Sequence, residues 1–252
     1  MLKYIHKKKI YQNYNFFTTT SRPSNSIHNL NFAALTPDMR KAFSPLNDIF
    51  VEFDFESYHP RLIAKLTGYD FGNSSVYGKL ADDLGVTESE AKNITFQNLY
   101  GGVRKDIAKM SEFFRGVEDL VKVLDHHIAA FIKDLQFDLG DKRIKLDSLW
   151  INILPSGGTH PSHLHPHSVI SGTTYVTMPE GTSAIKFEDP RLAMMMAAPI
   201  RKADAPAELR SFIYLTPKEG EVLLWESWLR HEVPLNLTDE ERISVSFNYS
   251  WT

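Results

Sequence analysis

The sequence of 252 residues contains no cysteine. This absence excludes disulfides, thiolate metal sites and cysteine nucleophiles, and it suits a cytoplasmic protein. The chain also has no apolar run that approaches the roughly 18 residues of a membrane span, so we expect no membrane segment. The net charge of −3 argues against a generally basic nucleic-acid-binding protein.

We expect no signal peptide either, because the charged residues 1–9 are not followed by an apolar segment. The sequence shows no internal repeat and no low-complexity tract. Its 42% hydrophobic and 23% charged residues are ordinary for a globular protein. This length allows one large domain or two small ones with a sizeable core.

Histidine is concentrated in one stretch, where His160, His163, His165 and His167 lie within eight residues. In a strand, residues two apart share a face, so the last three are expected to project the same way. Neutral imidazole is the commonest nitrogen ligand of metals and suits iron, zinc, copper or nickel. A cluster beside the apolar residues 169–176 therefore indicates a metal site rather than a polar loop. Pro166 should interrupt the strand, which favours His163 with His165.

A third anchor for a metal is found far downstream, where His231 follows an apolar stretch. Residues 242–248 then alternate strictly between polar and apolar types, which is typical of a strand with one buried face. Arg242 and Ser244 share the polar face. If that face points into a barrel, the two residues make a fixed fork for a carboxylate; if it points outward, Arg242 is simply solvated.

Short strands with Pro- and Gly-bearing turns between them are expected throughout the second half. They cover residues 149–154, 169–178, 184–187, 212–215, 221–230 and 242–249. Several short strands separated by such turns predict a β-sandwich or β-barrel. The Met-rich insertion 190–210 is either a lid over the site or a helix packed on the sheet. Asp189 and Arg191 are expected to form a local ion pair.

In the first half of the sequence, the residue patterns predict more helices than strands. Residues 10–48 suggest loops and extended structure, residues 50–55 a strand, and residues 60–66 the start of a helix. A helix is predicted from Thr87 to about Asn98, with Thr87 and Glu90 as a capping box. Helical apolar spacing over 117–135, after a boundary at Arg115-Gly116, predicts a helix that packs on the outside of the sheet.

Five ordered pieces of the second half together resemble the Fe(II)/2-oxoglutarate-dependent oxygenases. They read W-I-N (150–152), H-L-H-P-H-S-V-I-S-G-T-T-Y-V (163–176), F-E-D-P-R (187–191), H-E-V (231–233) and R-I-S-V-S-F-N (242–248). The resemblance covers about residues 117–252. It implies an α+β chain whose C-terminal part is a double-stranded β-helix, a jelly-roll or cupin-like barrel with a flanking helix. It also implies an iron-dependent oxidoreductase that hydroxylates an unknown substrate.

The same resemblance implies roles for the metal ligands. His163 and His231 would bind Fe(II). The usual third ligand of this family is Asp or Glu, but His165 stands at that position. His167 and Glu188 remain alternatives for the third ligand. Three neutral imidazoles would leave the full dipositive charge on the metal.

The resemblance also implies a pocket for the cosubstrate. Arg242, assisted by Ser244, would bind the distal carboxylate of 2-oxoglutarate. Asn152 and Tyr175 would line the same pocket.

Part of the first half is similar to family A DNA polymerases. Residues 18–25, 53–61 and 92–101 look like the template-side loop, the first catalytic strand and the finger helix of that family. Asp54 matches its metal-binding aspartate, and Lys92 and Tyr100 match positions that contact the nucleotide.

This second resemblance has departures. His59, Glu88 and Gln97 stand where the family has Glu, Arg and Gly. No second acidic motif follows, and two-metal phosphoryl transfer needs carboxylates for both ions. Residues 16–114 are therefore interpreted as a truncated, non-catalytic piece. It is either a vestigial packing or partly disordered segment, which is favoured, or an appendage through which the chain contacts nucleic acid. The predicted domains are 1–115 and 116–252.

Three functions follow from these patterns. The first is a 2-oxoglutarate-dependent dioxygenase. The second is a cupin-like metal-binding protein without 2-oxoglutarate chemistry, and the third is a nucleic-acid-binding polymerase remnant. The Arg242-x-Ser244 pair after His231 favours the first, because a generic metal-binding barrel does not require it.

Overall fold

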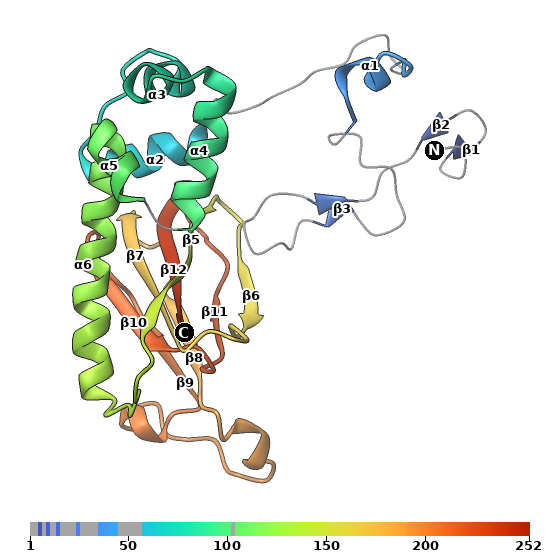
Figure 1. Ribbon diagram of the computed structural model, residues 1–252. Coiled ribbons are helices and arrows are strands. Elements are labelled where there is room, and N and C mark those ends of the chain that lie inside the picture. Colours follow the sequence, from blue (N-terminus) through green and yellow to red (C-terminus); the bar gives the residue numbers. More distant parts are fainter. Residues whose placement is uncertain are drawn as a thin grey trace. The chain divides into compact units, whose positions relative to one another are not determined.

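A computed structural model describes residues 5–6, 9–10, 14–15, 24–25, 35–44, 57–101 and 104–252 (Figure 1). The chain separates into two units, residues 1–56 and 57–252. In the first unit, β1 (Ile5–His6) pairs with β2 (Lys9–Ile10), β3 (Tyr14–Asn15) pairs with β4 (Ser24–Asn25), and α1 spans Pro37–Arg40. The strand predicted for residues 50–55 lies outside the described residues.

The second unit begins with a helical layer. It contains α2 (Tyr58–Thr67), α3 (Val76–Leu84), α4 (Glu88–Gly101), α5 (Lys105–Met110) and α6 (Glu112–Asp134). The capping box predicted for α4 is confirmed: the Thr87 backbone N donates to Glu90 Oε2 at 3.0 Å, and the Glu90 backbone N donates to Thr87 Oγ1 at 3.3 Å. In the described part of the chain, no helix combines the length and apolar character needed to cross a bilayer.

Helix α6 begins earlier than predicted, and the expected boundary at Arg115-Gly116 lies inside it. Two aromatic residues extend its buried face, since Phe113 and Phe114 are fully enclosed. Gly116 has a packing role instead of a linker role. A Cβ atom at this position would lie 2.8 Å from Thr67 Cβ of α2, so the glycine allows the two helices to approach closely.

Eight strands form two four-stranded antiparallel sheets. The first has the order β10 (Val222–Glu226), β7 (Ile170–Thr177), β12 (Arg242–Trp251), β5 (Ile144–Leu154). The second has the order β6 (His160–His163), β11 (His231–Val233), β8 (Ile185–Glu188), β9 (Phe212–Leu215). Because the chain passes repeatedly between the two sheets, this order fits a jelly-roll fold, as expected from the sequence.

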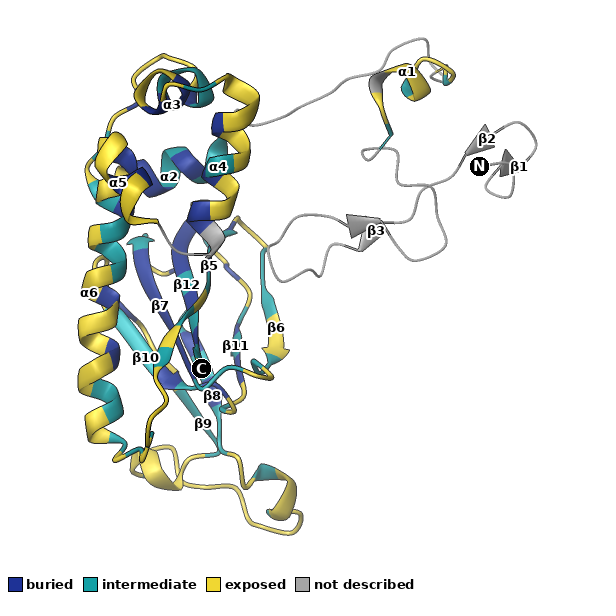
Figure 2. Cartoon of the chain, in the orientation of Figure 1, coloured by how far each residue is buried: buried dark blue, intermediate teal, exposed yellow. Residues whose placement is uncertain are grey.

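The helical layer and the first sheet share one hydrophobic core. Ile243, Val245, Phe247 and Tyr249 of β12 are buried in it together with residues of α6 such as Leu124 and Ile128. Figure 2 shows the buried residues concentrated on these strands and on the facing side of the helices. The Tyr249 hydroxyl also donates to Asp125 Oδ1 of α6 at 2.7 Å. By strand alternation, the polar residues of β12 therefore face away from the helices, into the barrel.

The insertion between β8 and β9 is not the helix packed on the sheet that was one of its two expected forms. It contains two short 3₁₀ turns, Leu192–Met194 and Ala207–Leu209. Met196 and Ile200 are exposed, and Ile200 is 100% accessible. Prolines at 190, 199 and 206 explain the lack of a longer helix, because each removes a backbone donor. The lid stays a prediction, whereas the Asp189–Arg191 ion pair is confirmed at 2.6 Å.

Candidate metal centre

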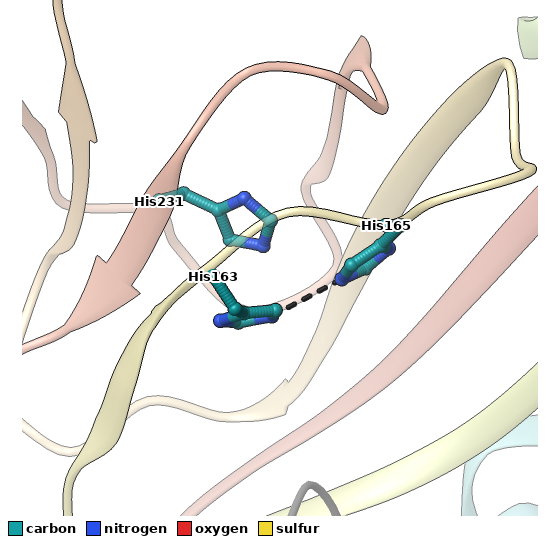
Figure 3. A group of neighbouring side chains, drawn as sticks. All are labelled: His163, His165 and His231. Carbon is teal, nitrogen blue, oxygen red and sulfur yellow. Dashed lines mark hydrogen bonds between the residues drawn. The ribbon is translucent and has the colours of Figure 1, made fainter.

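Three histidines from two separate parts of the chain meet between the sheets (Figure 3). His163 ends β6, His165 follows two residues later, and His231 begins β11 directly opposite His163 in the strand register. One ring nitrogen from each lies within 4.8 Å of the others. The Nε2 atoms of His163 and His165 are 3.1 Å apart. Among the described residues, this is the group whose side chains could together hold a metal ion.

Backbone carbonyls fix the tautomers of two of these rings. His163 Nδ1 lies 2.7 Å from the Pro161 carbonyl oxygen, and His231 Nδ1 lies 3.0 Å from the Leu229 carbonyl oxygen. A carbonyl oxygen can only accept, so each Nδ1 carries the proton. Nε2 of both rings therefore keeps a free lone pair.

The third ring is held by side chains. His165 Nδ1 lies 2.6 Å from Asn248 Oδ1 and 2.8 Å from Ser171 Oγ. The amide oxygen accepts the Nδ1 proton, which leaves Nε2 of His165 free as well. Two lone pairs that face each other at 3.1 Å repel unless a cation or a proton lies between them. This donor set therefore fits a metal ion, and each ligand has the outer hydrogen bond that metal-binding histidines usually make.

The three rings are also in the protonation state that a metal needs. Burial lowers the pKa of His163 to about 4 and the pKa of His231 to about 3. Burial lowers the pKa of His165 as well, although its hydrogen bond with Asn248 opposes this. All three are therefore neutral at pH 7, and neutral imidazole is the metal-binding form.

The expectation that His167 shares the face of His163 and His165 is wrong. Strand β6 ends at His163, and the chain turns at Pro166 and His167. His167 is exposed, has a φ of 73° and is not part of the three-histidine group. Glu188, the other alternative, lies on β8 with its Oε1 3.9 Å from Arg230 Nε and is not part of the three-histidine group.

Arg242 lies at the start of β12 on the inner face, and only 4% of it is exposed. Its Nε and the hydroxyl of Tyr175 are buried and have no hydrogen-bond partner among the described residues. The guanidinium carbon lies 5.0 Å from the centre of the Tyr175 ring, and Ser244 pairs opposite Tyr175 in the register. A buried cation beside an unpaired hydroxyl is costly without an anionic partner. These groups therefore fit a bound carboxylate.

Electrostatics keep both groups as donors. Burial lowers the pKa of Arg242, but a guanidinium stays protonated at neutral pH. Burial raises the pKa of Tyr175 to about 12, which the neighbouring Arg242 partly opposes. At pH 7 the pair therefore offers N–H and O–H groups to an anion.

Asn152 is engaged differently. Its Oδ1 accepts from Trp150 Nε1 at 3.2 Å, and its Nδ2 donates to Ser246 Oγ at 2.8 Å. Ser246 Oγ lies 3.1 Å from Thr173 Oγ1. Asn152 thus belongs to a hydrogen-bonded network on the barrel interior, unlike the Nε of Arg242, which has no partner among the described residues.

A continuous polar face joins the arginine to the histidines. Along β12, Ser244 lies opposite Tyr175, Ser246 opposite Thr173 and Asn248 opposite Ser171. Each two-residue step advances about 6.6 Å along the strand. Arg242 begins this series, and Asn248 at its other end contacts His165.

The sequence interpretation missed several residues around the histidines. Asn248 and Ser171 hold His165, Ser227 contacts Ser171 at 2.7 Å, and the Trp225 ring centre lies 4.8 Å from that of His231. The available signal was the strand period of two, which puts Asn248 on the same face as Arg242 and Ser244.

Comparison with known proteins bears on one region of the chain. Residues 148–248 match a family described as "Putative 2OG-Fe(II) oxygenase". The match supports the oxygenase resemblance for this region, which contains all three histidines and Arg242. It does not reach the polymerase-like segment, which stays a prediction; Asp54 lies outside the described residues. No curated protein matches the sequence significantly.

Solved structures with similarity to the chain include three bacterial proteins. An oxidoreductase of the 2OG-Fe(II) oxygenase family from Burkholderia pseudomallei is 17% identical, with a TM-score of 0.36 and coverage of 48% of this chain and 49% of that one. A Pseudomonas putida prolyl-4-hydroxylase is 16% identical, with a TM-score of 0.37 and coverage of 54% and 65%. A Bordetella pertussis cupin domain is 18% identical, with a TM-score of 0.26 and coverage of 46% and 88%. The chain thus spans less than two thirds of the length of the first two.

Proposed function

We propose that this protein is an Fe(II)- and 2-oxoglutarate-dependent oxygenase that hydroxylates a substrate still to be identified. The observation that carries the proposal is the convergence of three free Nε2 atoms, from His163, His165 and His231, in the barrel whose inner face also buries Arg242. The family match over residues 148–248 supports the same reaction class.

In this proposal the three histidines hold Fe(II) through Nε2. Because the protein would supply only three ligands, further coordination positions on the metal would stay open for 2-oxoglutarate and dioxygen. When bound, Fe(II) would allow dioxygen to oxidise both 2-oxoglutarate and the substrate: one oxygen atom would go into succinate as 2-oxoglutarate loses carbon dioxide, and the other would hydroxylate a C–H bond of the substrate.

The chain's own residues bind and orient the cosubstrate. Arg242 and Ser244 receive its distal carboxylate, and the Tyr175 hydroxyl donates to the same group. Because Arg242 is 4% exposed, water competes poorly for these contacts. A charged hydrogen bond of this kind contributes about 1.5–3 kcal/mol to cosubstrate binding.

The absence of a carboxylate ligand alters the charge balance of the proposed site. Three neutral imidazoles leave both positive charges of the metal uncancelled, so a dianionic cosubstrate is attracted more strongly than by a site with one carboxylate. The same feature favours a second candidate, a cupin-like metal-binding protein that does not use 2-oxoglutarate. The buried Arg242, whose Nε has no hydrogen-bond partner among the described residues, is the observation against it, since such a protein needs no internal carboxylate fork.

Anaerobic titration with Fe(II) and then 2-oxoglutarate tests the proposal. We expect a metal-to-ligand charge-transfer band when both are present, and release of succinate after air is admitted. His231→Ala should abolish the band, whereas His126→Ala, an exposed histidine on α6, should leave it unchanged. A protein that binds Fe(II) but shows neither the band nor succinate would support the cupin-like alternative.

A further inference from the structure

The three histidines are held in two different ways. His163 and His231 each donate Nδ1–H to a backbone carbonyl two residues earlier in the chain. His165 instead depends on the side chain of Asn248, which lies 83 positions away on β12. Only this ligand therefore has an orientation that a distant side chain decides.

A directed chain of hydrogen bonds supports Asn248. Ser171 Oγ donates to Asn248 Oδ1 at 2.8 Å, so the hydroxyl of Ser227, 2.7 Å from Ser171 Oγ, must donate to Ser171. Both serines are fully buried. The backbone carbonyl of Ser227 also accepts from the His165 backbone N at 3.0 Å. His165 is thus clamped at its backbone by Ser227 and at its ring by Asn248.

The direction of the Asn248 amide determines whether His165 can bind a metal. With Oδ1 toward the ring, the proton lies on Nδ1 and Nε2 is free. With the amide rotated by half a turn, Nδ2 would donate to Nδ1, and the proton would move to Nε2. That proton would point at His163 Nε2, 3.1 Å away, and one metal donor would be lost.

We propose that Asn248 is the positioning residue for the third metal ligand: its amide oxygen holds the proton of His165 on Nδ1 and thereby presents Nε2 to the metal. This inference rests on the metal-binding part of the proposed function. Ser171 is a reserve acceptor, because its Oγ lies 2.8 Å from the same Nδ1. Asn248 is neutral, so it orients the ring without returning the negative charge that a carboxylate ligand would bring.

Titration of the full chain with Co(II), followed by its d–d absorption bands, tests this role. We expect Asn248→Leu to bind Co(II) more weakly than wild type, and Asn248→Leu with Ser171→Ala to bind about 10- to 100-fold more weakly, the range for outer hydrogen bonds of metal ligands. Ser171→Ala alone should weaken Co(II) binding less than Asn248→Leu, since Asn248 remains but loses the hydrogen bond from the Ser171 hydroxyl. Asn248→Asp, which can only accept, should bind at least as tightly as wild type. Ser250→Asp adds the same negative charge on the same strand and should change the Co(II) affinity little.

A second measurement distinguishes the orientation of the His165 ring by Asn248 from a general packing role of that residue. In the Zn(II)-loaded protein, ¹⁵N NMR of His165 should show a protonated Nδ1 and a ligated Nε2 in wild type and Asn248→Asp. Thermal unfolding without metal shows whether each variant folds, and Asn248→Ala replaces the leucine variant if that one does not. The inference is overturned if the double variant binds Co(II) as tightly as wild type. It is also overturned if Asn248→Asp and Asn248→Leu weaken binding equally.

The outcome for the proposed function is distinguishable. If wild type does not bind Co(II), both ideas fail. If the Asn248 variants bind Co(II) as expected but no charge-transfer band forms with Fe(II) and 2-oxoglutarate, only the oxygenase proposal fails. If the band forms and the double variant binds Co(II) normally, only the role of Asn248 fails.

Discussion

His231 lies directly opposite His163 in the pairing of β11 with β6. Two of the three candidate ligands are therefore fixed by sheet register, and their backbones cannot move apart without breaking the pairing. His165 lies beyond the end of β6 and depends on Asn248 instead. The site thus combines a rigid pair with a third ligand that has its own support.

Metal binding should stabilise the fold because the three ligands join β6 and the loop that follows it to β11. We expect Zn(II) or Co(II) at about 100 times its dissociation constant to add about 2.7 kcal/mol to the free energy of unfolding. Urea unfolding with metal and with a chelator measures the difference. His163→Ala should remove it and His127→Ala, on the exposed side of α6, should not. If metal stabilised both variants equally, the metal would have to bind at a site other than the three histidines.

Replacement of Arg242 by methionine should separate cosubstrate binding from metal binding. We expect 2-oxoglutarate to bind roughly 10- to 100-fold more weakly, from the loss of about 1.5–3 kcal/mol, while Co(II) affinity stays the same. The metal-free variant should be as stable as wild type or more stable, because a buried cation with no carboxylate partner among the described residues is removed. Isothermal titration and urea unfolding measure the two effects. Arg201→Ala, an exposed arginine in the insertion, is the control. Wild-type affinity for 2-oxoglutarate in Arg242→Met would refute the carboxylate fork.

Gly172→Ala should destabilise the sheet. A Cβ atom at this position would overlap the Phe247 ring and lie 2.7 Å from Leu224, so the ring that covers the glycine would have to move. Overpacking of this kind costs about 1–3 kcal/mol. The double variant Gly172→Ala, Phe247→Leu should recover part of the loss, which a double-mutant cycle measures. Additive effects would show that the two side chains do not interact.

The metal-free protein should lose stability as the pH falls. The pKa of His163 is about 4 and that of His231 is about 3 in the folded state, against about 6.5 in an unfolded chain. The unfolded state therefore binds protons first, so stability is greatest above pH 6.5 and decreases as the pH falls from there toward 4. Each histidine contributes a slope of up to about 1.4 kcal/mol per pH unit. Urea unfolding in chelator at pH 8 and pH 5 measures it, and His163→Gln, His231→Gln should show a shallower slope. An unchanged slope would contradict the assigned pKa values.

Local patterns predicted the fold well where neighbouring residues decide the structure. The Thr87–Glu90 capping box and the alternation over residues 242–248 are set within a few positions, and the structure has both. The start of α6 could not be predicted in this way. Gly116 looks like a helix breaker in sequence, but its purpose is the contact with Thr67, which only the packed helices bring close.

The candidate site was predictable in its residues but less so in its geometry. His163, His165 and His231 were identified from clustering and from the resemblance, and they meet in the structure. The strand assumption failed at His167, because Pro166 and the positive φ of His167 turn the chain. The role of Asn248 in orienting His165 could not be predicted from the sequence. It depends on the cross-strand neighbour Ser171 and on the path of the loop that carries His165.

Strand β12 carries on one side the apolar residues that dock against α6 and on the other side Arg242, Ser244 and Asn248. A slip of one residue along this strand would exchange the two sets, so the hydrophobic core and the ligand pocket would be lost together. The protein therefore has no intermediate arrangement in which the core is intact but the pocket is misaligned by one position. Retention of metal is consequently a sensitive reporter of whether a variant has reached its native strand pairing.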